Sequence, residues 1–306
     1  MTGARQVDIR EVAPRDGLQN EAPVSTEAKL ELVAALAATG VGRIEVTSFV
    51  SPRAIPALAD AELVASHLHR WPDIAFSALV AGIGGVRRAL AAGVTRLEYV
   101  VSASDGHSLA NVGRTSAESV ALIGSVAELV HRAGGELEVI VAIAFDCPFD
   151  GPTAPHRVAE IAARAVAAGA DSLSVADTVG TATPRRVAEV VDLVRAATPA
   201  VELGLHLHNT RGQGLANAWS GHLHGIRRFD SAAGGFGGCP FAPGAGGNIA
   251  TEELVYLFED SGIATGIDLA ATLDAAALAA RLLGRSADSN LLRAGGRLHP
   301  SSGSRR

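Results

Sequence analysis

Short runs of β-branched and apolar residues alternate with alanine- and leucine-rich stretches along most of this 306-residue chain. The stretches have helical spacing, and several end in a glycine, as at Gly40, Gly93, Gly134 and Gly169, which is typical of a helix C-cap. Eight runs have the composition of buried strands, at residues 7–13, 43–49, 75–80, 96–103, 137–145, 172–178, 202–209 and 228–233. Strands that alternate with helices predict a parallel sheet.

Eight such units within about 250 residues predict an α/β fold, a closed (β/α)8 TIM barrel. A doubly wound open sheet is the alternative, but the chain lacks a dinucleotide-binding fingerprint, which favours closure. Residues 251–261 and 269–283 would form the eighth helix and an extra C-terminal helix. We therefore expect one domain over residues 1–285, a catalytic barrel with a C-terminal helical extension, and a flexible tail over residues 286–306.

Composition narrows the classes of function. The formal net charge is -6 and no run of basic residues occurs, so we expect no nucleic-acid partner. No apolar stretch reaches membrane-spanning length, and two cysteines do not make a disulfide framework, which favours a cytoplasmic protein away from membranes.

Lys29 is the only lysine, and we expect it on the solvated face of a helix. Schiff-base chemistry needs a lysine in the active site. Carbon–carbon chemistry in this chain would therefore need another way to stabilise a carbanion, most plausibly a metal ion.

Polar residues gather where the predicted strands end. In a (β/α)8 barrel the active site forms at the C-terminal ends of the strands, so these residues would share one rim. They are Arg15, Asp16, Glu45, Ser48, Asp177, Thr178, His206 and His208.

His206 and His208 alternate along one predicted strand, so both side chains would point to the same face. Two neutral imidazoles on an inward face favour a metal ion as partner, although a pair of rim histidines bound to water is the alternative. Asp16 would add a carboxylate oxygen and Asn248 an amide oxygen. Such a set suits Mg²⁺, Mn²⁺ or another divalent ion rather than a closed zinc site.

Arg15 would place a fixed cation beside this metal site. It could neutralise negative charge that develops on an oxygen in the transition state, or simply pair with Asp16 or Glu45. Glu45 lies in mid-strand and faces inward, so we expect it to hold Arg15 or a metal-bound water molecule in place. Asp177 could give similar support from the sixth strand.

A glycine-dense segment, residues 235–248, carries Cys239 near its centre and Asn248 at its end. A loop so rich in glycine is mobile or lays its backbone close to a ligand. Cys239 would then be a reactive group delivered by a lid, and the alternative is a surface loop with an incidental cysteine.

Five segments resemble one known family. They are EVAPRDGLQNE at residues 11–21, EVTSFVSP at 45–52, DTVG at 177–180, HLH at 206–208, and the stretch from GGCP at 237–240 to GN at 247–248. The chain resembles the 3-hydroxy-3-methylglutaryl-CoA (HMG-CoA) lyase family, in register from about residue 7 to about residue 283.

The resemblance implies a divalent-metal-dependent cleavage of HMG-CoA to acetyl-CoA and acetoacetate, a homodimer, and a place in leucine degradation and ketone-body formation. Its metal ligands would be Asp16, His206, His208 and Asn248. Its catalytic residues would be Arg15, Glu45, Asp177, His206 and Cys239. Its acyl-CoA substrate would contact Arg15, Gln19, Ser48, Ser174 and Thr178. We expect Arg211, which departs from the family's pattern, to contact the substrate as well.

The chain also departs from the family's usual pattern. Residues 206–211 are HLHNTR where the family usually has HCHDTY, and residues 139–142 are VIVA where it has RGYV. Residues 101–107, VSASDGH, replace a sequence of the FGAASE type. These departures bear on the substrate more than on the reaction, so another branched 3-hydroxyacyl-CoA is an alternative.

Two further alternatives are an acetyl-CoA-dependent condensing synthase and a non-catalytic binding protein of the same fold. The synthases usually carry additional C-terminal domains, and a binding protein predicts loss of the metal ligands. A biotin-dependent carboxyltransferase is disfavoured because Lys29 is misplaced for a modified lysine at the metal.

Overall fold

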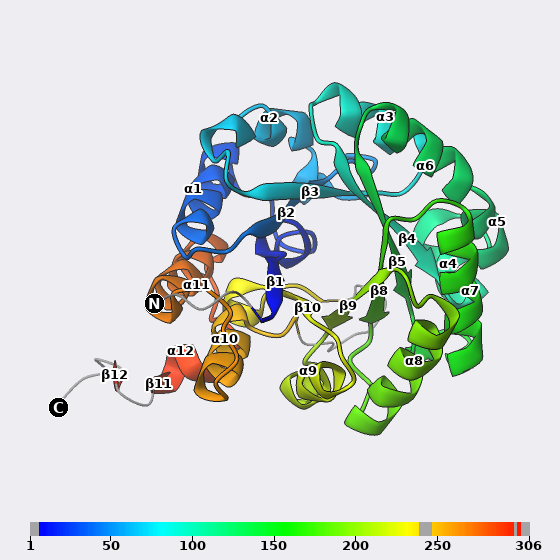
Figure 1. Ribbon diagram of the computed structural model, residues 1–306. Coiled ribbons are helices and arrows are strands. Elements are labelled where there is room, and N and C mark those ends of the chain that lie inside the picture. The colour runs from blue at the N-terminus through cyan, green and yellow to red at the C-terminus, as the bar shows by residue number, and fades with distance from the viewer. Residues whose placement is uncertain (1–5, 239–246, 297–298, 301–306) are drawn as a thin grey trace.

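The computed structural model describes residues 6–238, 247–296 and 299–300. Eight parallel strands close into a barrel in the order β1-β10-β9-β8-β5-β4-β3-β2, and helices surround it (Figure 1). The barrel strands are β1 (Asp8–Glu11), β2 (Arg43–Ser48), β3 (Ala75–Val80), β4 (Arg96–Ser102), β5 (Glu136–Ala142), β8 (Ser172–Asp177), β9 (Glu202–Leu207) and β10 (Arg228–Ser231). The predicted (β/α)8 barrel is confirmed.

The longer helices form the outer layer, and α11 packs against α1, where the two ends of the fold meet (Figure 1). They are α1 (Thr26–Ala37), α3 (Ile83–Ala91), α6 (Ile123–Arg132), α7 (Pro155–Ala167), α8 (Pro184–Ala197), α9 (Gly214–Leu223), α10 (Thr251–Asp260) and α11 (Leu269–Leu283). The shorter elements are α2 (Ala61–Ala65), α4 (Asp105–Val112), α5 (Ser116–Ala121), α12 (Asn290–Ala294) and the pairs β6 (Asp146–Cys147) with β7 (Gly151–Pro152) and β11 (Gly295–Gly296) with β12 (His299–Pro300).

Two stretches with helical spacing, residues 57–69 and 116–133, do not form continuous helices. The stretch 57–69 contains only α2 between two short 3-10 turns, Pro56–Leu58 and Leu68–Arg70. The stretch 116–133 is divided between α5 and α6 at Leu122, which ends one helix and begins the next. The helix α4 was not predicted, and the Ser104 side chain caps it by accepting from the His107 N–H.

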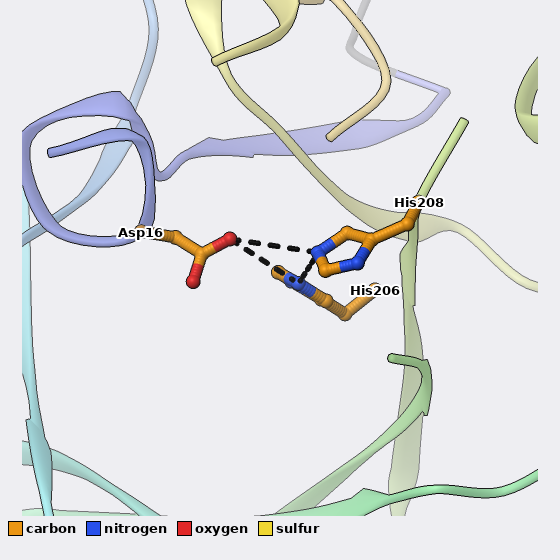
Figure 2. Close-up of side chains that lie close together, drawn as sticks. All are labelled: Asp16, His206 and His208. Carbon is orange, nitrogen blue, oxygen red and sulfur yellow. Dashed lines mark hydrogen bonds and ion pairs between the residues drawn. The ribbon is translucent and has the colours of Figure 1, made fainter. Parts of the chain in front are cut away.

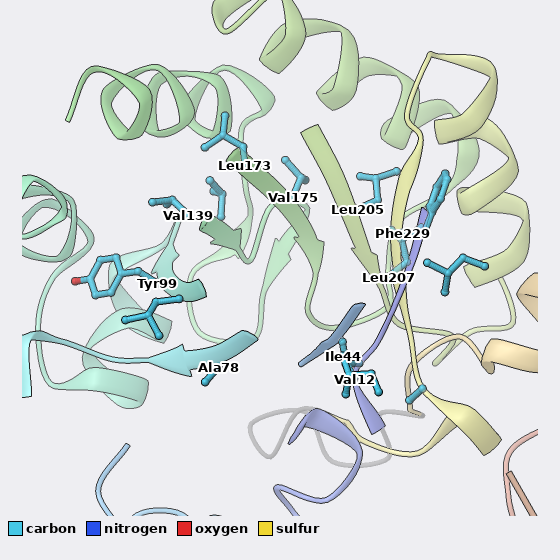
Figure 3. Close-up of a cluster of buried hydrophobic side chains, with 14 of the residues drawn as sticks. Val12, Ile44, Ala78, Tyr99, Val139, Leu173, Val175, Leu205, Leu207 and Phe229 are labelled. Atoms are coloured by element: carbon cyan, nitrogen blue, oxygen red, sulfur yellow. The ribbon is translucent and has the colours of Figure 1, made fainter. Parts of the chain in front are cut away.

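Alternation along the strands separates two layers of side chains. Apolar side chains such as Ile44, Tyr99, Val139 and Phe229 are buried between the sheet and the helices, where they form the main core (Figure 3). Their neighbours in sequence, which point the other way, fill the inside of the barrel.

The inside of this barrel is charged, whereas branched apolar residues dominate the interior of most such barrels. Arg10 on β1 reaches across to Glu138 on the opposite strand β5 at 2.7 Å, and Arg228 on β10 contacts the same carboxylate at 2.9 Å. Gly204 leaves room for this layer, because a Cβ there would lie 2.7 Å from the Arg228 Nε. A layer of buried ion pairs therefore fills the barrel below the rim residues.

The expectation for Lys29 was wrong. Its side chain is buried, and Nζ donates to the Ala57 carbonyl at 2.6 Å and pairs with Asp60. The ammonium group binds α1 to the neighbouring loop, which a helical pattern alone does not reveal.

The segment expected to be a flexible tail begins with ordered contacts. The Asp288 N–H donates to the Gly234 carbonyl, and the Asn290 N–H at the start of α12 donates to the Glu253 carboxylate. Among the residues that the structure describes, no helix is long and apolar enough to cross a membrane.

Candidate active site

The chain leaves β1 through a wide turn that carries Arg15 and Asp16. Residues Ala13–Gly17 form a short π-helix, in which the N–H groups of Arg15, Asp16 and Gly17 lie 2.8–3.2 Å from the Val12 carbonyl. Turns of this type are rare in proteins, and those that occur often lie at functional sites. The turn places both charged side chains at the C-terminal mouth of the barrel.

Asp16 faces the two predicted histidine ligands across this mouth (Figure 2). Its Oδ2 lies 3.6 Å from the His208 Nε2 and 3.8 Å from the His206 Nε2, and the two Nε2 atoms are 3.3 Å apart. His206 lies near the end of β9 and His208 directly after it, where it pairs with Asn248 in an isolated bridge. All four side chains are buried.

Asp16 is held in its charged form. Burial disfavours a carboxylate, but Arg15 and the two histidines outweigh it and hold the pKa of Asp16 well below its usual range. Oδ1 accepts from Arg15 and from Gln19, each at 2.6 Å. The second oxygen, Oδ2, is therefore left to face the histidines and the Asn248 amide, whose Nδ2 donates to it at 2.6 Å.

His208 turns its ring nitrogen Nε2 toward Asp16. Its Nδ1 lies 2.8 Å from the Thr178 carbonyl oxygen, which can only accept, so Nδ1 carries the hydrogen of the neutral ring and the Nε2 lone pair faces Asp16. Burial opposes a charge on His208, but Asp16 overcomes it and raises the imidazole's pKa. A cation bound between the two rings would accept the Nε2 lone pairs of both His206 and His208.

The donor set fits a divalent cation. Asp16, His206 and His208 each place one ligand atom within 4.8 Å of the others. The Asn248 Oδ1 is buried and has no hydrogen-bond partner among the described residues, so it can serve as a neutral oxygen ligand. Mixed oxygen and imidazole ligands suit Mg²⁺ or Mn²⁺ and do not form a closed zinc site.

Arg15 lies between the cluster and Glu45. Its two terminal nitrogens contact Asp16 at 2.6 Å and Glu45 at 2.7 Å, while its buried Nε has no hydrogen-bond partner within the described part of the chain. Burial, only partly opposed by Arg15, raises the pKa of Glu45 well above its usual value, and nearby Glu98 raises it further. Glu45 thus fixes the guanidinium in place and can itself carry a proton.

The remaining predicted residues lie around the same rim. Asp177 accepts from the Thr181 and Ala182 N–H groups at 3.0 and 2.9 Å, so its carboxylate anchors the loop after β8, and burial raises its pKa. Arg211 is exposed and donates to the carbonyls of Val179 and Gly180.

The predicted hydroxyl residues differ in burial. Ser48 and Ser174 are buried, and the Ser48 Oγ lacks a hydrogen-bond partner among residues with described positions. Thr178 uses its Oγ1 to accept from the Ile143 N–H. Cys239 lies outside the described residues.

Comparison with known proteins places the chain in a family. The family model described as HMGL-like matches residues 6–279. The chain belongs to the HMGL-like family.

Several relatives of this HMGL-like protein are carbon–carbon lyases. The (R)-citramalyl-CoA lyase of Chloroflexus aurantiacus is 46% identical over 290 residues, covering 91% of this chain and 92% of that protein. A hydroxymethylglutaryl-CoA lyase of Bacillus subtilis is 38% identical over 273 residues, covering 89% and 91%. An HMG-CoA lyase structure from Acinetobacter baumannii, in complex with coenzyme A and 3-methylmalate, superimposes with a TM-score of 0.91 at 42% identity, covering 96% of this chain and 97% of that one. The predicted class of enzyme, a carbon–carbon lyase, is confirmed.

Sequence reasoning missed two buried carboxylates, one in this HMGL-like site and one that supports the loops beside it. Asp230 on β10 contacts His206, and Glu11 on β1 accepts from the N–H groups of Ala13 and Ala233. Asp230 follows the inward alternation of its strand, which was the available signal. No sequence pattern indicated the partners of Glu11, because Ala233 lies in a loop far away in the sequence that meets Glu11 only in the folded protein.

Proposed function

We propose that this protein cleaves 3-hydroxy-3-methylglutaryl-CoA to acetyl-CoA and acetoacetate with the help of a divalent metal ion. The observation that carries the proposal is the convergence of Asp16, His206 and His208 next to the Arg15 guanidinium, at the mouth of a barrel whose relatives are acyl-CoA lyases. Cleavage of the C2–C3 bond requires a base that takes the proton of the C3 hydroxyl and a group that stabilises the departing enolate, whose carbon then takes a proton from an acid.

Asp16, His206, His208 and Asn248 would hold the cation. When bound, a divalent ion orients the substrate and lowers the pKa of its C3 hydroxyl. Arg15 would stabilise the enolate oxygen of the departing acetyl-CoA, because its position is fixed by Asp16 and Glu45 before the charge develops. The thiol of Cys239 would return a proton to the enolate carbon.

The rim residues would line the substrate. Ser48 ends β2, Ser174 lies on β8 and Thr178 follows β8. Gln19 orients Asp16, and Arg211 offers a cation at the edge of the mouth. Asp177 would support the site indirectly, since its carboxylate holds the loop that supplies the Thr178 carbonyl to His208.

(R)-Citramalyl-CoA is a second candidate substrate. The relative at 46% identity bears that activity in its name. In this chain, residues 101–107 at the end of β4 and residues 139–142 on β5 depart from the usual HMG-CoA lyase pattern. The two thioesters differ by one methylene group, and the same bond cleavage would give pyruvate in place of acetoacetate. One methylene in a pocket changes specificity by about 10- to 200-fold, so one substrate should clearly prevail.

The test compares kcat/KM for the two thioesters with Mg²⁺ or Mn²⁺ present, and identifies acetoacetate or pyruvate with a dehydrogenase specific for each. Cys239→Ser should lower turnover by orders of magnitude and leave metal binding nearly normal. A preference for citramalyl-CoA would select the second substrate, and no cleavage of either would refute the proposed chemistry. We also propose a homodimer, which light scattering would test.

A further inference from the structure

We propose that Asp230, held in place by Arg10, is the positioning residue that fixes the tautomer and orientation of His206 and thereby sets the metal affinity of the site. This inference rests on the proposed metal centre. It concerns side chains that contact a metal ligand rather than the ligands themselves.

The strand register brings the three residues together. Arg10 on β1 is the Cα partner of Asp230 on β10, and Asp230 is the Cα partner of His206 on β9. Neighbouring parallel strands in register point partner side chains to the same face, so all three project into the barrel at one level. They are separated by up to 220 positions in the sequence and meet only because the barrel closes.

Asp230 dictates which nitrogen of His206 carries the hydrogen. The His206 Nδ1 lies 3.1 Å from the Asp230 Oδ2. An ionised carboxylate can only accept, so Nδ1 is the donor and the Nε2 lone pair turns toward Asp16 and the metal site. A carboxylate behind a metal-ligating imidazole both orients the ring and makes its free nitrogen a stronger ligand.

Arg10 keeps Asp230 ionised and in one plane. Its Nε donates to Oδ1 at 2.9 Å and a terminal nitrogen donates to Oδ2 at 2.7 Å, a two-point contact that fixes the carboxylate. Both side chains are 2% exposed, so solvent does not compete for the pair. Arg10 also contacts Glu98 and Glu138, which leaves it with anionic partners if Asp230 is replaced.

The two imidazoles are thus supported differently. His208 donates to a neutral backbone carbonyl, whereas His206 donates to a charged side chain. Only the second partner can be removed by substitution, which makes the inference testable at a single position.

The test compares Asp230→Ala and Asp230→Asn with Glu138→Gln. Glu138→Gln is the matched control because Glu138 is buried and contacts Arg10 as Asp230 does, but the carboxylate contacts Arg228 rather than His206. The dissociation constant of Mn²⁺ is measured on each full-length protein by paramagnetic resonance, with circular dichroism as a check on folding. Nitrogen NMR of the metal-free proteins at mildly alkaline pH reports the tautomer of each neutral histidine.

We expect Asp230→Ala to weaken Mn²⁺ binding by about 10- to 100-fold and to change the tautomer signal of one histidine. Asp230→Asn keeps an acceptor oxygen for His206 but loses the charge. This variant should fold, and its Mn²⁺ affinity should lie between those of Asp230→Ala and the wild type. Glu138→Gln should leave Mn²⁺ binding within about twofold, whatever its effect on stability.

Unchanged Mn²⁺ affinity in both Asp230 variants, or an equal loss in Glu138→Gln, would overturn the inference. If Asp230→Ala does not fold, Asp230→Asn decides between these outcomes. His208→Ala separates the metal site from the role of Asp230: if that variant loses Mn²⁺ while the Asp230 variants keep it, the proposed metal site stands and the proposed role of Asp230 is refuted.

Discussion

Glu11 should make the stability of this protein fall as the pH rises toward neutrality. Its side chain is 1% exposed, and its oxygens accept from the N–H groups of Ala13 and Ala233 and from the Thr251 hydroxyl. Burial raises the pKa of Glu11 from 4.5 to about 7 despite these three hydrogen bonds. The folded protein therefore binds a proton at this site more tightly than the unfolded chain does.

The size of the effect follows from the two pKa values. The stabilisation by the proton is complete below the unfolded value of 4.5 and is lost as the pH rises through about 7. At about 1.4 kcal/mol per pH unit, the interval corresponds to about 3 kcal/mol of unfolding free energy.

Glu11→Gln should remove this pH dependence without disturbing the loops. A glutamine oxygen can still accept from Ala13 and Ala233, and its amide nitrogen can donate to the Thr251 Oγ1, which lies 2.8 Å from the Ser231 hydroxyl and can redirect its own hydrogen there. The variant should match the wild type near pH 5 and exceed its stability near pH 8 by up to about 3 kcal/mol.

Urea denaturation of the metal-free proteins at several pH values between about 5 and about 8 measures this difference. Glu136→Gln serves as the control, because the Glu136 side chain is 59% exposed and its loss should leave the pH curve unchanged. Parallel curves for the wild type and Glu11→Gln would refute the reasoning, since Glu11 would then titrate alike in the folded and unfolded states.

Three further substitutions test the site. His208→Ala should weaken Mn²⁺ binding by more than about 100-fold, and unchanged metal content after purification would argue against this ligand. Gly237→Ala should also weaken it, because Gly237 has a φ of 104° and a Cβ there would lie 2.6 Å from the Asn248 Nδ2 and 3.1 Å from the Asp16 Oδ2; a fully bound metal in that variant would contradict the geometry. Arg15→Lys should lower kcat by about 100- to 1000-fold with a small change in KM, because an ammonium group cannot hold both carboxylates and still face the substrate; steady-state kinetics decides.

The main features of the site could be predicted because they depend on local order. The alternation of His206 and His208 on a strand predicted a shared direction, and Asp16 followed the first strand at the correct end of the barrel. The end of the second predicted strand likewise located Ser48, and Glu45 proved to contact Arg15 as expected. Each of these inferences needs only the period of a strand and the rule that parallel strands end at one rim.

Other features depend on which side chains meet, and these could not be predicted. Asp177 was placed correctly on its strand, but its carboxylate binds two N–H groups of its own loop. Lys29 lies on a helix whose pattern suggests solvent, yet Asp60 and the Ala57 carbonyl bury its ammonium group.

The sequence by itself determined the succession of strands and helices, the closed barrel and the rim on which the polar residues gather, because local spacing and hydrophobic period govern these features. Only the tertiary structure decided that Arg10, Asp230 and His206 share one level of the interior. That arrangement depends on the register between strands far apart in the chain. A shift of one residue in any strand would turn its side chains to the other face, so the partners of a buried charge are fixed only when the barrel closes.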